Sequence, residues 1–402
     1  MSSLKQYTNQ TTYEAAMYRC QYAFDNFEKV YVSFSGGKDS SVMIHMMAQE
    51  AIRRGRTFGV LIIDLEAQYK NTIKHIHDVL EMYEGIIDPY WVCLPLSLRN
   101  AVSNFEPKWI CWQRDKECEW VRPMPKLDCV ISEESYFDFF QDGMEFEEFM
   151  VLFGVWYSDG VDTCACIGIR ADESLNRFRT IASKTKEMHG VARFTTKVCD
   201  NLYNLYPVYD WKTKDVWRFH KRHPDLPHNE VYDMMHLAGM SINQMRLCQP
   251  YGDDQRRGLW LYHILEPDTW YRVVARVNGV NGGSLYINET GNINGYNKIT
   301  KPENHTWESF CKLLLATMPE KTRNHYTPRF RDWMRRWRDR GYANGIPDEA
   351  PSELENKYWA PSWRRLCKVL LRNDWWCKGL GLTQPKSDAY GRYLDIKKKR
   401  KK

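Results

Sequence analysis

The fold is decided by the stretch Tyr31-Val32-Ser33-Phe34-Ser35-Gly36-Gly37-Lys38-Asp39-Ser40-Ser41-Val42-Met43-Ile44. A β-branched and aromatic run ends in Ser-Gly-Gly, and apolar residues with helical spacing follow. The pattern therefore predicts a strand, a tight loop and a helix. Two adjacent glycines allow a ligand to approach the backbone closely, and the first amides of a helix have no partner inside the helix. A loop of this kind attracts phosphate.

Polar side chains within this loop strengthen the phosphate interpretation. Lys38 adds a positive charge, the serines add hydroxyl donors, and Asp39 can either help to hold a magnesium ion or orient the loop. An isolated Gly-Gly pair would indicate only a turn, whereas here the whole hexapeptide Ser35–Ser40 stands at a strand-to-helix junction. It is not the Walker loop, which requires Gly-x-x-x-x-Gly-Lys-Ser/Thr.

The hexapeptide resembles the pyrophosphate-binding loop of the ATP pyrophosphatase (PP-loop) superfamily. With Phe34 before it and Ser41-Val42-Met43 after it, it resembles the branch that contains phosphoadenosine phosphosulfate (PAPS) reductase and the small subunit of ATP sulfurylase. This resemblance implies an α/β fold of the adenine nucleotide alpha hydrolase type. It also implies nucleotide contacts at Ser33, Phe34, Ser35, Gly36, Gly37, Lys38, Asp39 and Ser40.

The composition indicates a globular protein with a large core and two domains. The chain has 402 residues, of which 43% are hydrophobic and 14% aromatic. No apolar run approaches the roughly 18 residues of a membrane span, and the first residues lack the apolar region of a signal peptide. Twelve scattered cysteines fit reduced thiols better than a disulfide framework. We therefore expect a cytoplasmic protein without a membrane partner.

A second strand is predicted at residues 57–64, where a continuous apolar run ends in Asp64. Helix and strand patterns continue to alternate, which predicts a doubly wound parallel sheet with its ligand at the switch point. Asp64 would then face the ligand, and a capping or loop aspartate is the alternative. In the PAPS reductase family this strand end lies against adenine and ribose, so the resemblance assigns that role to Ile62, Ile63 and Asp64.

A third informative stretch contains an apolar strand that ends at Gly168, with Arg170 and Arg177 flanking the start of the next helix. Glycine lets a backbone approach a ligand, and two arginines near a strand end can clamp an oxyanion. The alternative pairs these arginines with Asp172 and Glu173 in a surface network. The pattern Gly-Ile-Arg-x-x-Glu-Ser-x-x-Arg resembles the family motif that borders the ribose and phosphates.

The stretch from Met245 to Gly252 resembles the substrate segment of the family. Arg246 lies in it, and Arg256 and Arg257 follow shortly after. These arginines can bind sulfate or a second anionic group, or they can form a solvated charged face. The resemblance covers roughly residues 15–260.

One departure from the family pattern concerns the reductase reaction. PAPS reductases attack sulfur with a cysteine in a C-terminal Glu-Cys-Gly motif, which this chain lacks. Cys377, in Trp-Cys-Lys-Gly, resembles that motif only weakly, and Cys248 is the other candidate nucleophile. A reactive thiol needs thiolate character and access.

Two segments interrupt the alternation of strands and helices. Residues 109–125 interleave tryptophans with basic residues, so they either cover the nucleotide or pack on the sheet. Cys111, Cys118 and Cys129 are too widely spaced for a zinc site, and we expect no protein-bound metal. The acidic stretch 133–148 is expected to form a solvated pair of helices.

The C-terminal region is basic. From Lys301 onward it has 24 Lys and Arg against 12 Asp and Glu, whereas the first 300 residues have 33 against 39. Arginines between residues 329 and 340 surround Trp333 and Trp337, and the chain ends in six basic residues. Basic charge interleaved with aromatic rings suits nucleic acid, through phosphate neutralisation and stacking. The alternative is a small helical domain with a solvated basic face and a disordered tail.

We expect three regions along the chain. Residues 1–260 form a nucleotide-binding domain with an insertion at about 105–150, residues 261–300 connect, and residues 301–402 form a smaller, mainly helical basic domain. This arrangement resembles phage and prophage proteins of the PAPS reductase family of the IbrA type. Since these occur beside a ParB-like protein, the resemblance implies DNA or a ParB-like protein as a possible partner.

The favoured activity is ATP-dependent adenylyl transfer with release of pyrophosphate. The nucleotide is ATP or a PAPS-like adenine nucleotide, with Mg²⁺ bridging its phosphates. The catalytic candidates are Lys38, Asp39, Arg170, Arg177 and Arg246. One alternative is a nucleotide-sensing regulatory or phage accessory protein, and another is sulfonucleotide reduction.

Overall fold

The computed structural model describes residues 9–382 except 104, 184, 243, 249, 253–259, 278 and 280–298, and also residue 391. Contacts along the chain divide it into two compact units. Unit 1 comprises residues 1–96, 111–247 and 387–402, and unit 2 comprises residues 97–110 and 248–386. The domain boundaries expected from the sequence stay a prediction.

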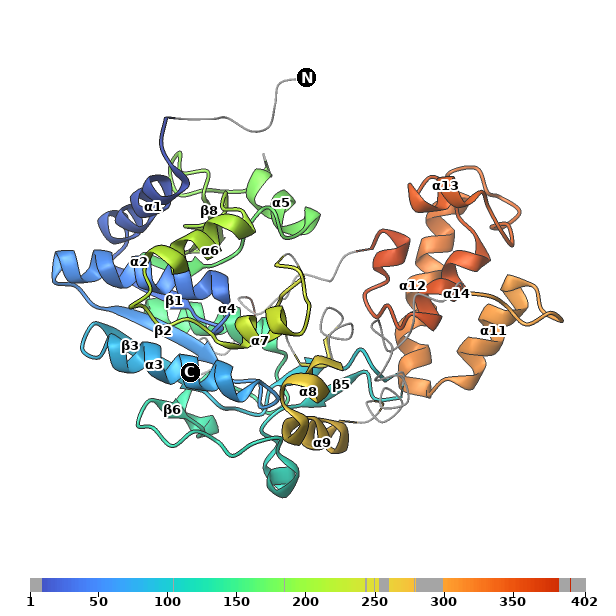
Figure 1. Cartoon of the computed structure of the whole chain (residues 1–402). Helices are drawn as coiled ribbons and strands as arrows, with labels where there is room; N and C mark the ends of the chain where they lie inside the picture. The colour runs from blue at the N-terminus through green and yellow to red at the C-terminus, as the bar shows by residue number, and fades with distance from the viewer. Residues whose placement is uncertain are drawn as a thin grey trace, which may run out of the picture. The chain divides into compact units, whose positions relative to one another are not determined.

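A mostly parallel sheet of seven strands forms the centre of unit 1 (Figure 1), as the alternation of strands and helices predicted. Its order is β6-β3-β2-β1-β7-β9-β8, and only β8 runs antiparallel to its neighbour β9. The strand bounds are β1 Lys29–Ser33, β2 Phe58–Ile63, β3 Ile87–Val92, β6 Val130–Ile131, β7 Thr163–Ile167, β8 Thr195–Cys199 and β9 Leu202–Leu205. β1 lies between β2 and β7, so the loop that follows β1 emerges at the carboxyl edge between two parallel neighbours.

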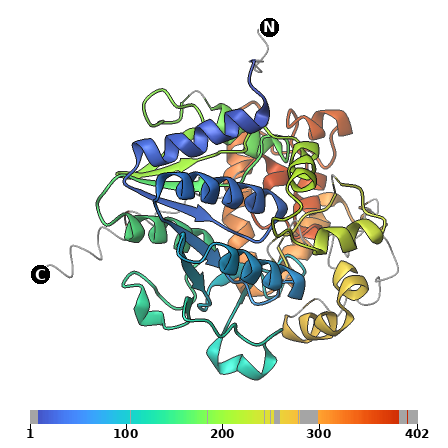
Figure 2. The same ribbon diagram turned by 60° about the vertical axis from the view of Figure 1, so that its left-hand side comes forward.

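Helices flank this sheet. Figure 2 shows α1, α2 and α3 side by side over the face turned toward the viewer. Tyr31 of β1 contacts Phe153 of α4, whereas the adjacent Val30 and Val32 point the other way because side chains alternate along a strand. The helix bounds are α1 Thr12–Asn26, α2 Lys38–Arg54, α3 Lys70–Met82, α4 Phe146–Ser158, α5 Leu175–Ala182, α6 Thr213–Arg222 and α7 Val231–Leu237.

The acidic stretch 133–148 does not form the expected pair of helices. It contains one short 3₁₀ turn, η2 Glu134–Tyr136, before α4 begins at Phe146. Phe137 and Phe139 are buried and pack against Phe149. The prediction was wrong because these alternating aromatic side chains, and not the carboxylates around them, determine how the segment packs.

Unit 2 combines a small hairpin with helices, in agreement with the expected helical C-terminal region. The hairpin pairs β4 Ser97–Arg99 with β5 Lys108–Ile110. Asn373 donates hydrogen bonds to the carbonyl oxygens of Ala101 and Ser103, and the Arg99 guanidinium donates to the Asn373 carbonyl, which explains why residues 97–110 belong to this unit. The other elements are α8 Trp260–Leu265, α9 Pro267–Arg276, α11 Trp307–Thr317, α12 Glu320–Arg338, α13 Ser352–Asn356, α14 Trp363–Leu371 and η4 Lys378–Leu380.

The core of the helical part of unit 2 is rich in aromatic residues. It contains Trp307, Tyr326, Phe330, Trp333, Trp337, Leu366, Leu370 and Trp375, among others. Among the residues that the structure describes, no helix has the length and apolar character needed to cross a membrane. All twelve cysteines lie in the described segments, and none of them forms a disulfide bond.

Candidate functional site

The loop between β1 and α2 has the expected strand, loop and helix geometry. Gly36 has a φ of +68°, a conformation that favours glycine. A Cβ atom at Gly36 would lie 2.9 Å from Thr72 Cγ2 of α3, so the position excludes a side chain for a second reason. Gly37 caps the N-terminus of α2, which begins at Lys38. The first amides of α2 therefore lie at the carboxyl edge of the sheet.

The serines of the loop hold its own backbone in place. Ser40 and Ser41 hydroxyls donate to the Gly37 carbonyl at 2.9 and 3.0 Å. Ser35 Oγ lies 3.1 Å from Ser40 Oγ and accepts from the Gly37 amide at 3.4 Å. Ser41 Oγ also lies 2.7 Å from Nε2 of the buried His75. The hydroxyls thus rigidify the turn that presents the amides.

Residues near α7 hold the loop from the other side. The Lys38 amide donates to the Tyr232 hydroxyl at 3.1 Å, and Asn229 Nδ2 donates to the Gly36 carbonyl at 2.8 Å and to Thr72 Oγ1 at 3.0 Å. Asn229 and Tyr232 were not identified from the sequence as residues of the site. No local signal could show that they reach a loop almost 200 residues away in the chain.

Lys38 lies in a largely enclosed position. Its ammonium is 3.2 Å from Asp39 Oδ2, donates to the Met245 carbonyl at 3.2 Å, and lies 5.2 Å from the centre of the Tyr232 ring. Burial lowers its pKa, and the charge of Asp39 opposes that shift. The ammonium therefore lies beside the first turn of α2 with Asp39 as its charge partner.

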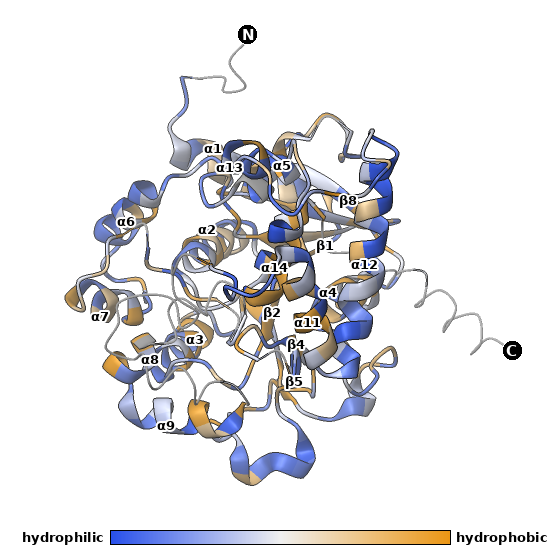
Figure 3. Cartoon of the chain, turned by 90° about the vertical axis from the view of Figure 1, so that its right-hand side faces the viewer, coloured by the Kyte–Doolittle hydropathy of each residue, from blue (hydrophilic) through white to orange (hydrophobic). Residues whose placement is uncertain are grey.

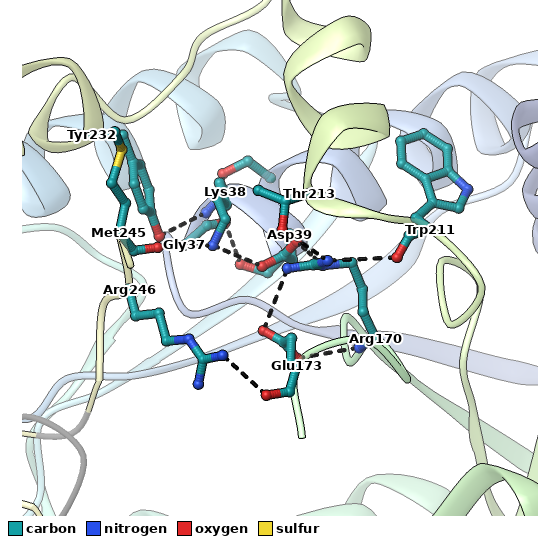
Figure 4. Close-up of polar contacts among 12 residues, drawn as sticks. Gly37, Lys38, Asp39, Arg170, Glu173, Trp211, Thr213, Tyr232, Met245 and Arg246 are labelled. Atoms are coloured by element: carbon teal, nitrogen blue, oxygen red, sulfur yellow. Dashed lines mark hydrogen bonds and ion pairs between the residues drawn. The ribbon is translucent and has the colours of Figure 1, made fainter. Parts of the chain in front are cut away.

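Asp39 and Arg170 form the central ion pair of the site (Figure 4). Arg170 Nε donates to Asp39 Oδ1 at 2.6 Å, and both side chains are largely buried. The Arg170 NH1 group lies 3.4 Å from Thr213 Oγ1 and 3.5 Å from the Trp211 carbonyl. Each Asp39 oxygen thus faces a cation, which favours its loop-orienting role over magnesium binding.

Three arginines gather around Glu173. The Arg170 guanidinium lies 3.9 Å from the Glu173 carboxylate, and Arg246 donates to the Glu173 carbonyl at 3.0 Å (Figure 4). Arg177 forms an ion pair with the same carboxylate. Arg177 and Arg246 are exposed. The pairing of Arg177 with Glu173 matches the alternative weighed for the sequence, and the same arrangement brings exposed guanidinium groups close to Lys38 and Arg170.

Gly168 approaches the protein's own backbone at this site. A Cβ atom there would lie 3.1 Å from the nitrogen and the Cα atom of Ser40, in the first turn of α2. The sequence led us to expect close approach to a ligand. In the structure the missing side chain lets the end of β7 pack directly on α2, which carries Arg170 to Asp39, and the approach of a ligand to Gly168 stays a prediction.

Asp64 is satisfied by protein partners. Its carboxylate accepts hydrogen bonds from the Glu66 amide and Trp91 Nε1, both at 2.9 Å, and it forms an ion pair with Arg122. Trp112 Nε1 donates to the Asp64 carbonyl at 2.8 Å. This corresponds to the loop aspartate that was the alternative interpretation. The other predicted nucleotide contacts are Ser33, the last residue of β1, Phe34 directly after it, and Ile63 at the end of β2. Phe34 is buried against His75.

Glu66 anchors the tryptophan-rich segment and was missed by the sequence reasoning. It is buried with a φ of +62°, and its two carboxylate oxygens accept from the amides of Trp112 at 2.7 Å and Val121 at 3.0 Å. Trp112 and Trp120 are buried and pack edge to face. Of the two interpretations, packing is therefore the one observed for these rings.

The two candidate nucleophilic cysteines differ in their surroundings. Burial raises the pKa of Cys377 to about 12, so its thiol stays protonated at neutral pH, and Cys248 is half-buried. The described parts of the chain contain no group of three or more His, Cys, Asp and Glu side chains arranged to hold a metal ion. Arg256 and Arg257 lie outside the described residues.

Comparison with protein families decides the relationship. Residues 29–238 match the family described as "Phosphoadenosine phosphosulfate reductase domain", which is more than half of the chain. The chain belongs to the PAPS reductase domain family. Residues 239–359 match a second family, described as "Domain of unknown function (DUF3440)". The protein thus carries a PAPS reductase-like nucleotide-binding domain, and membership of the IbrA-type branch stays a prediction.

Similar proteins and structures were also found. "Uncharacterized protein YbdN" of Escherichia coli K12 is 41% identical over 391 residues, which cover 96% of this chain and 94% of that protein. A PAPS reductase from Candida auris in a phosphate complex has a TM-score of 0.28 and 12% identity, over 57% of this chain and 93% of that chain. An FMN adenylyltransferase from Candida glabrata, in complex with FAD and inorganic pyrophosphate, has a TM-score of 0.33 and 14% identity, over 57% and 63%. The U34-tRNA thiolase NcsA from Methanococcus maripaludis has a TM-score of 0.31 and 11% identity, over 71% and 82%.

Proposed function

We propose that this protein binds ATP at the Gly36–Ser40 loop and transfers the adenylyl group to an acceptor with release of pyrophosphate. The observation that carries the proposal is the position of the Lys38 amide and ammonium groups. Its amide opens α2 and contacts a neutral tyrosine hydroxyl, while its ammonium is largely enclosed beside Arg170 and Arg246. A helix N-terminus with converging cations stabilises a polyphosphate.

In the proposed complex, the β- and γ-phosphates lie against the first amides of α2. A phosphate oxygen replaces the Tyr232 hydroxyl as the acceptor for the Lys38 amide, because a charged acceptor forms the stronger hydrogen bond. Magnesium would neutralise phosphate charge, and since the described residues contain no metal-binding cluster, we propose that it arrives with the nucleotide. Asp39 keeps Lys38 and Arg170 in position.

The proposed reaction forms a bond between the acceptor and the α-phosphorus and breaks the bond from that phosphorus to the bridging oxygen of pyrophosphate. The acceptor loses its proton to solvent. Lys38 neutralises the leaving pyrophosphate, and Arg170, with Arg177 and Arg246 nearer to solvent, stabilises negative charge that develops on the α-phosphate. Catalysis then rests mainly on positioning and charge.

A second candidate function is nucleotide sensing without turnover. It is favoured by the contacts of Lys38 with Tyr232 and Met245, because a nucleotide that displaces them would release the segment between α7 and Arg246. Sulfonucleotide reduction is a third candidate, supported by the family but opposed by the burial of Cys377.

The test compares ligand binding with turnover. We expect ATP to raise the melting temperature of the protein and pyrophosphate to accumulate, with both effects lost in Lys38→Ala and kept in Lys214→Ala, which changes an exposed lysine of α6. ATP binding without pyrophosphate release would favour sensing. Stabilisation only by PAPS, with thioredoxin-dependent sulfite release, would favour reduction. If none of the nucleotides raises the melting temperature, all three proposals are contradicted.

A further inference from the structure

Helix α12 of unit 2 has one face packed into the core. Tyr326, Phe330, Trp333 and Trp337 lie on that face, and each is at most 8% exposed. Their spacing of four, three and four residues follows the helical repeat, so they fix how the helix is rotated. Of the residues between them, Pro328, Arg331, Asp332, Arg335 and Arg336 are exposed, whereas Met334 also packs against the core.

The opposite face is strongly basic. Its exposed arginines are Arg331, Arg335, Arg336, Arg338 and, just beyond the helix, Arg340. Asp332 and Asp339 are the acidic residues in this stretch, and Asp332 pairs with Arg335 at 2.9 Å in an open surface geometry. Figure 3 shows long hydrophilic stretches along α12. The helix dipole stabilises positively charged side chains in the last turn of a helix, which accounts for Arg335, Arg336 and Arg338. It does not account for Arg331, which lies outside that turn.

The burial of the tryptophans changes what this surface can recognise. The sequence led us to expect stacking by Trp333 and Trp337, but these rings are 4% and 8% exposed and belong to the core. Stacking on unpaired bases requires an accessible ring. The exposed face of α12 therefore offers guanidinium groups that can bind phosphate. Trp333 and Trp337 are not exposed on it, so they cannot stack on the bases of a single strand.

We propose that the exposed face of α12 binds the phosphate backbone of double-stranded DNA. Guanidinium forks match phosphate oxygens in pairs. From Arg331 to Arg338 the helix rises about 10 Å, which is comparable with the ~12 Å width of the major groove of B-DNA. Double-stranded RNA offers a deep, narrow major groove instead. This surface belongs to unit 2 and does not depend on the nucleotide site.

The test uses the full chain and a labelled DNA duplex of random sequence. Binding is measured by fluorescence anisotropy between 50 and 200 mM salt, for the unchanged protein and for the triple variant Arg331→Gln, Arg335→Gln and Arg338→Gln. Loss of three phosphate contacts should reduce the slope of log K against log salt by about 2.7 and weaken binding at least tenfold at the lower salt concentration. Circular dichroism should show unchanged melting, because the three side chains are exposed.

The matched control removes the same charge elsewhere. The control is a triple variant of exposed residues of α6 in unit 1, Lys214→Gln, Lys221→Gln and Arg222→Gln. This variant should bind DNA like the unchanged protein. Equal losses in both variants would overturn the proposal, because binding would then follow net charge alone. A salt dependence that changes only when Lys397–Lys402 are deleted would also overturn the proposal. The same holds if single strands or double-stranded RNA bind more tightly than the DNA duplex. It holds as well if the triple variant loses only the binding of anionic vesicles.

Discussion

Arg170 Nε lies 2.6 Å from Asp39 Oδ1, so the backbone that follows β7 is fastened to the first turn of α2. The pair is largely buried, and Lys38 shares the same carboxylate. The ion pair joins the segment that carries Arg177 to the loop that presents the helix amides. The ion pair therefore adds to the contacts of Tyr232 and Asn229 a further link between the loop and a part of the chain that is far away in sequence.

Loss of this ion pair should destabilise the protein. Arg170→Leu leaves the Asp39 carboxylate without its main partner, and breaking a buried pair costs about 3–5 kcal/mol. Urea unfolding followed by circular dichroism measures the change. The control is Arg177→Leu, whose exposed ion pair should contribute less than about 1 kcal/mol. Equal effects of the two substitutions would contradict a special role for Arg170.

Removal of the Tyr232 hydroxyl should strengthen nucleotide binding. In Tyr232→Phe the Lys38 amide loses its acceptor in the free protein, at a cost of about 1 kcal/mol, while a bound phosphate would still satisfy it. The difference corresponds to about fivefold tighter binding, measurable by titration calorimetry with ATP. Tyr136→Phe, at an exposed tyrosine elsewhere in unit 1, should leave the affinity unchanged. Weaker binding by Tyr232→Phe would show that this hydroxyl contacts the ligand.

A methyl group at Gly36 should disrupt the loop more than one at another left-handed glycine. Gly36→Ala combines a φ of +68° with a contact of 2.9 Å to Thr72, whereas Gly55, at the end of α2, has a φ of +62° and open space around it. Gly55→Ala should cost about 1–2 kcal/mol of stability from backbone strain alone. We expect a larger loss for Gly36→Ala, and the loss of ATP-induced stabilisation only there. Thermal melting with and without ATP measures both, and equal melting temperatures would refute crowding at Gly36.

Stability should fall between pH 6.5 and pH 5 because four histidines stay neutral in the folded protein. Burial lowers the pKa of His45, His220 and His325 to about 4 and that of His75 to about 3. The unfolded chain takes up protons below about pH 6.5 and the native state does not, so stability present above that pH is lost as the pH falls. Each histidine contributes up to about 1.4 kcal/mol per pH unit.

The measurement is urea unfolding at pH 7, 6 and 5. The buried carboxylates Glu50 and Glu355 have lowered pKa values, so they weaken the fold only at lower pH and leave this window to the histidines. His45→Gln should reduce the slope by about 1.4 kcal/mol per pH unit. An unchanged slope in that variant would mean that His45 titrates normally in the folded state.

Much of unit 1 could be predicted because its signals are local. The β-branched run, the glycine pair and the apolar repeat after Lys38 are read directly as β1, the loop and α2. The partners of the loop could not be predicted in this way. Tyr232 and Asn229 reach it only through tertiary packing, and the periodicity around them indicates a helix without saying what it faces.

The spacing of the aromatic residues in the C-terminal region indicates a buried helix face, but we interpreted these residues as a stacking surface for nucleic acid. Tyr326, Phe330, Trp333 and Trp337 recur at helical spacing, which is typical of a buried face. The interleaved arginines suggested stacking on nucleic acid, although basic residues between core positions are also what a solvated helix face requires. Burial decides between the two, and sequence composition does not report burial.

The path of the chain through its two units has a consequence for inheritance and expression. Residues 97–110 are held by Asn373 in unit 2, yet the chain before and after them builds unit 1. A gene fragment that ends near residue 247 would encode this hairpin without the residue that anchors it, and no single cleavage can free one unit intact from the other. A continuous fragment of residues 248–386 would likewise lack the hairpin that Asn373 contacts, so neither unit corresponds to one uninterrupted piece of the chain.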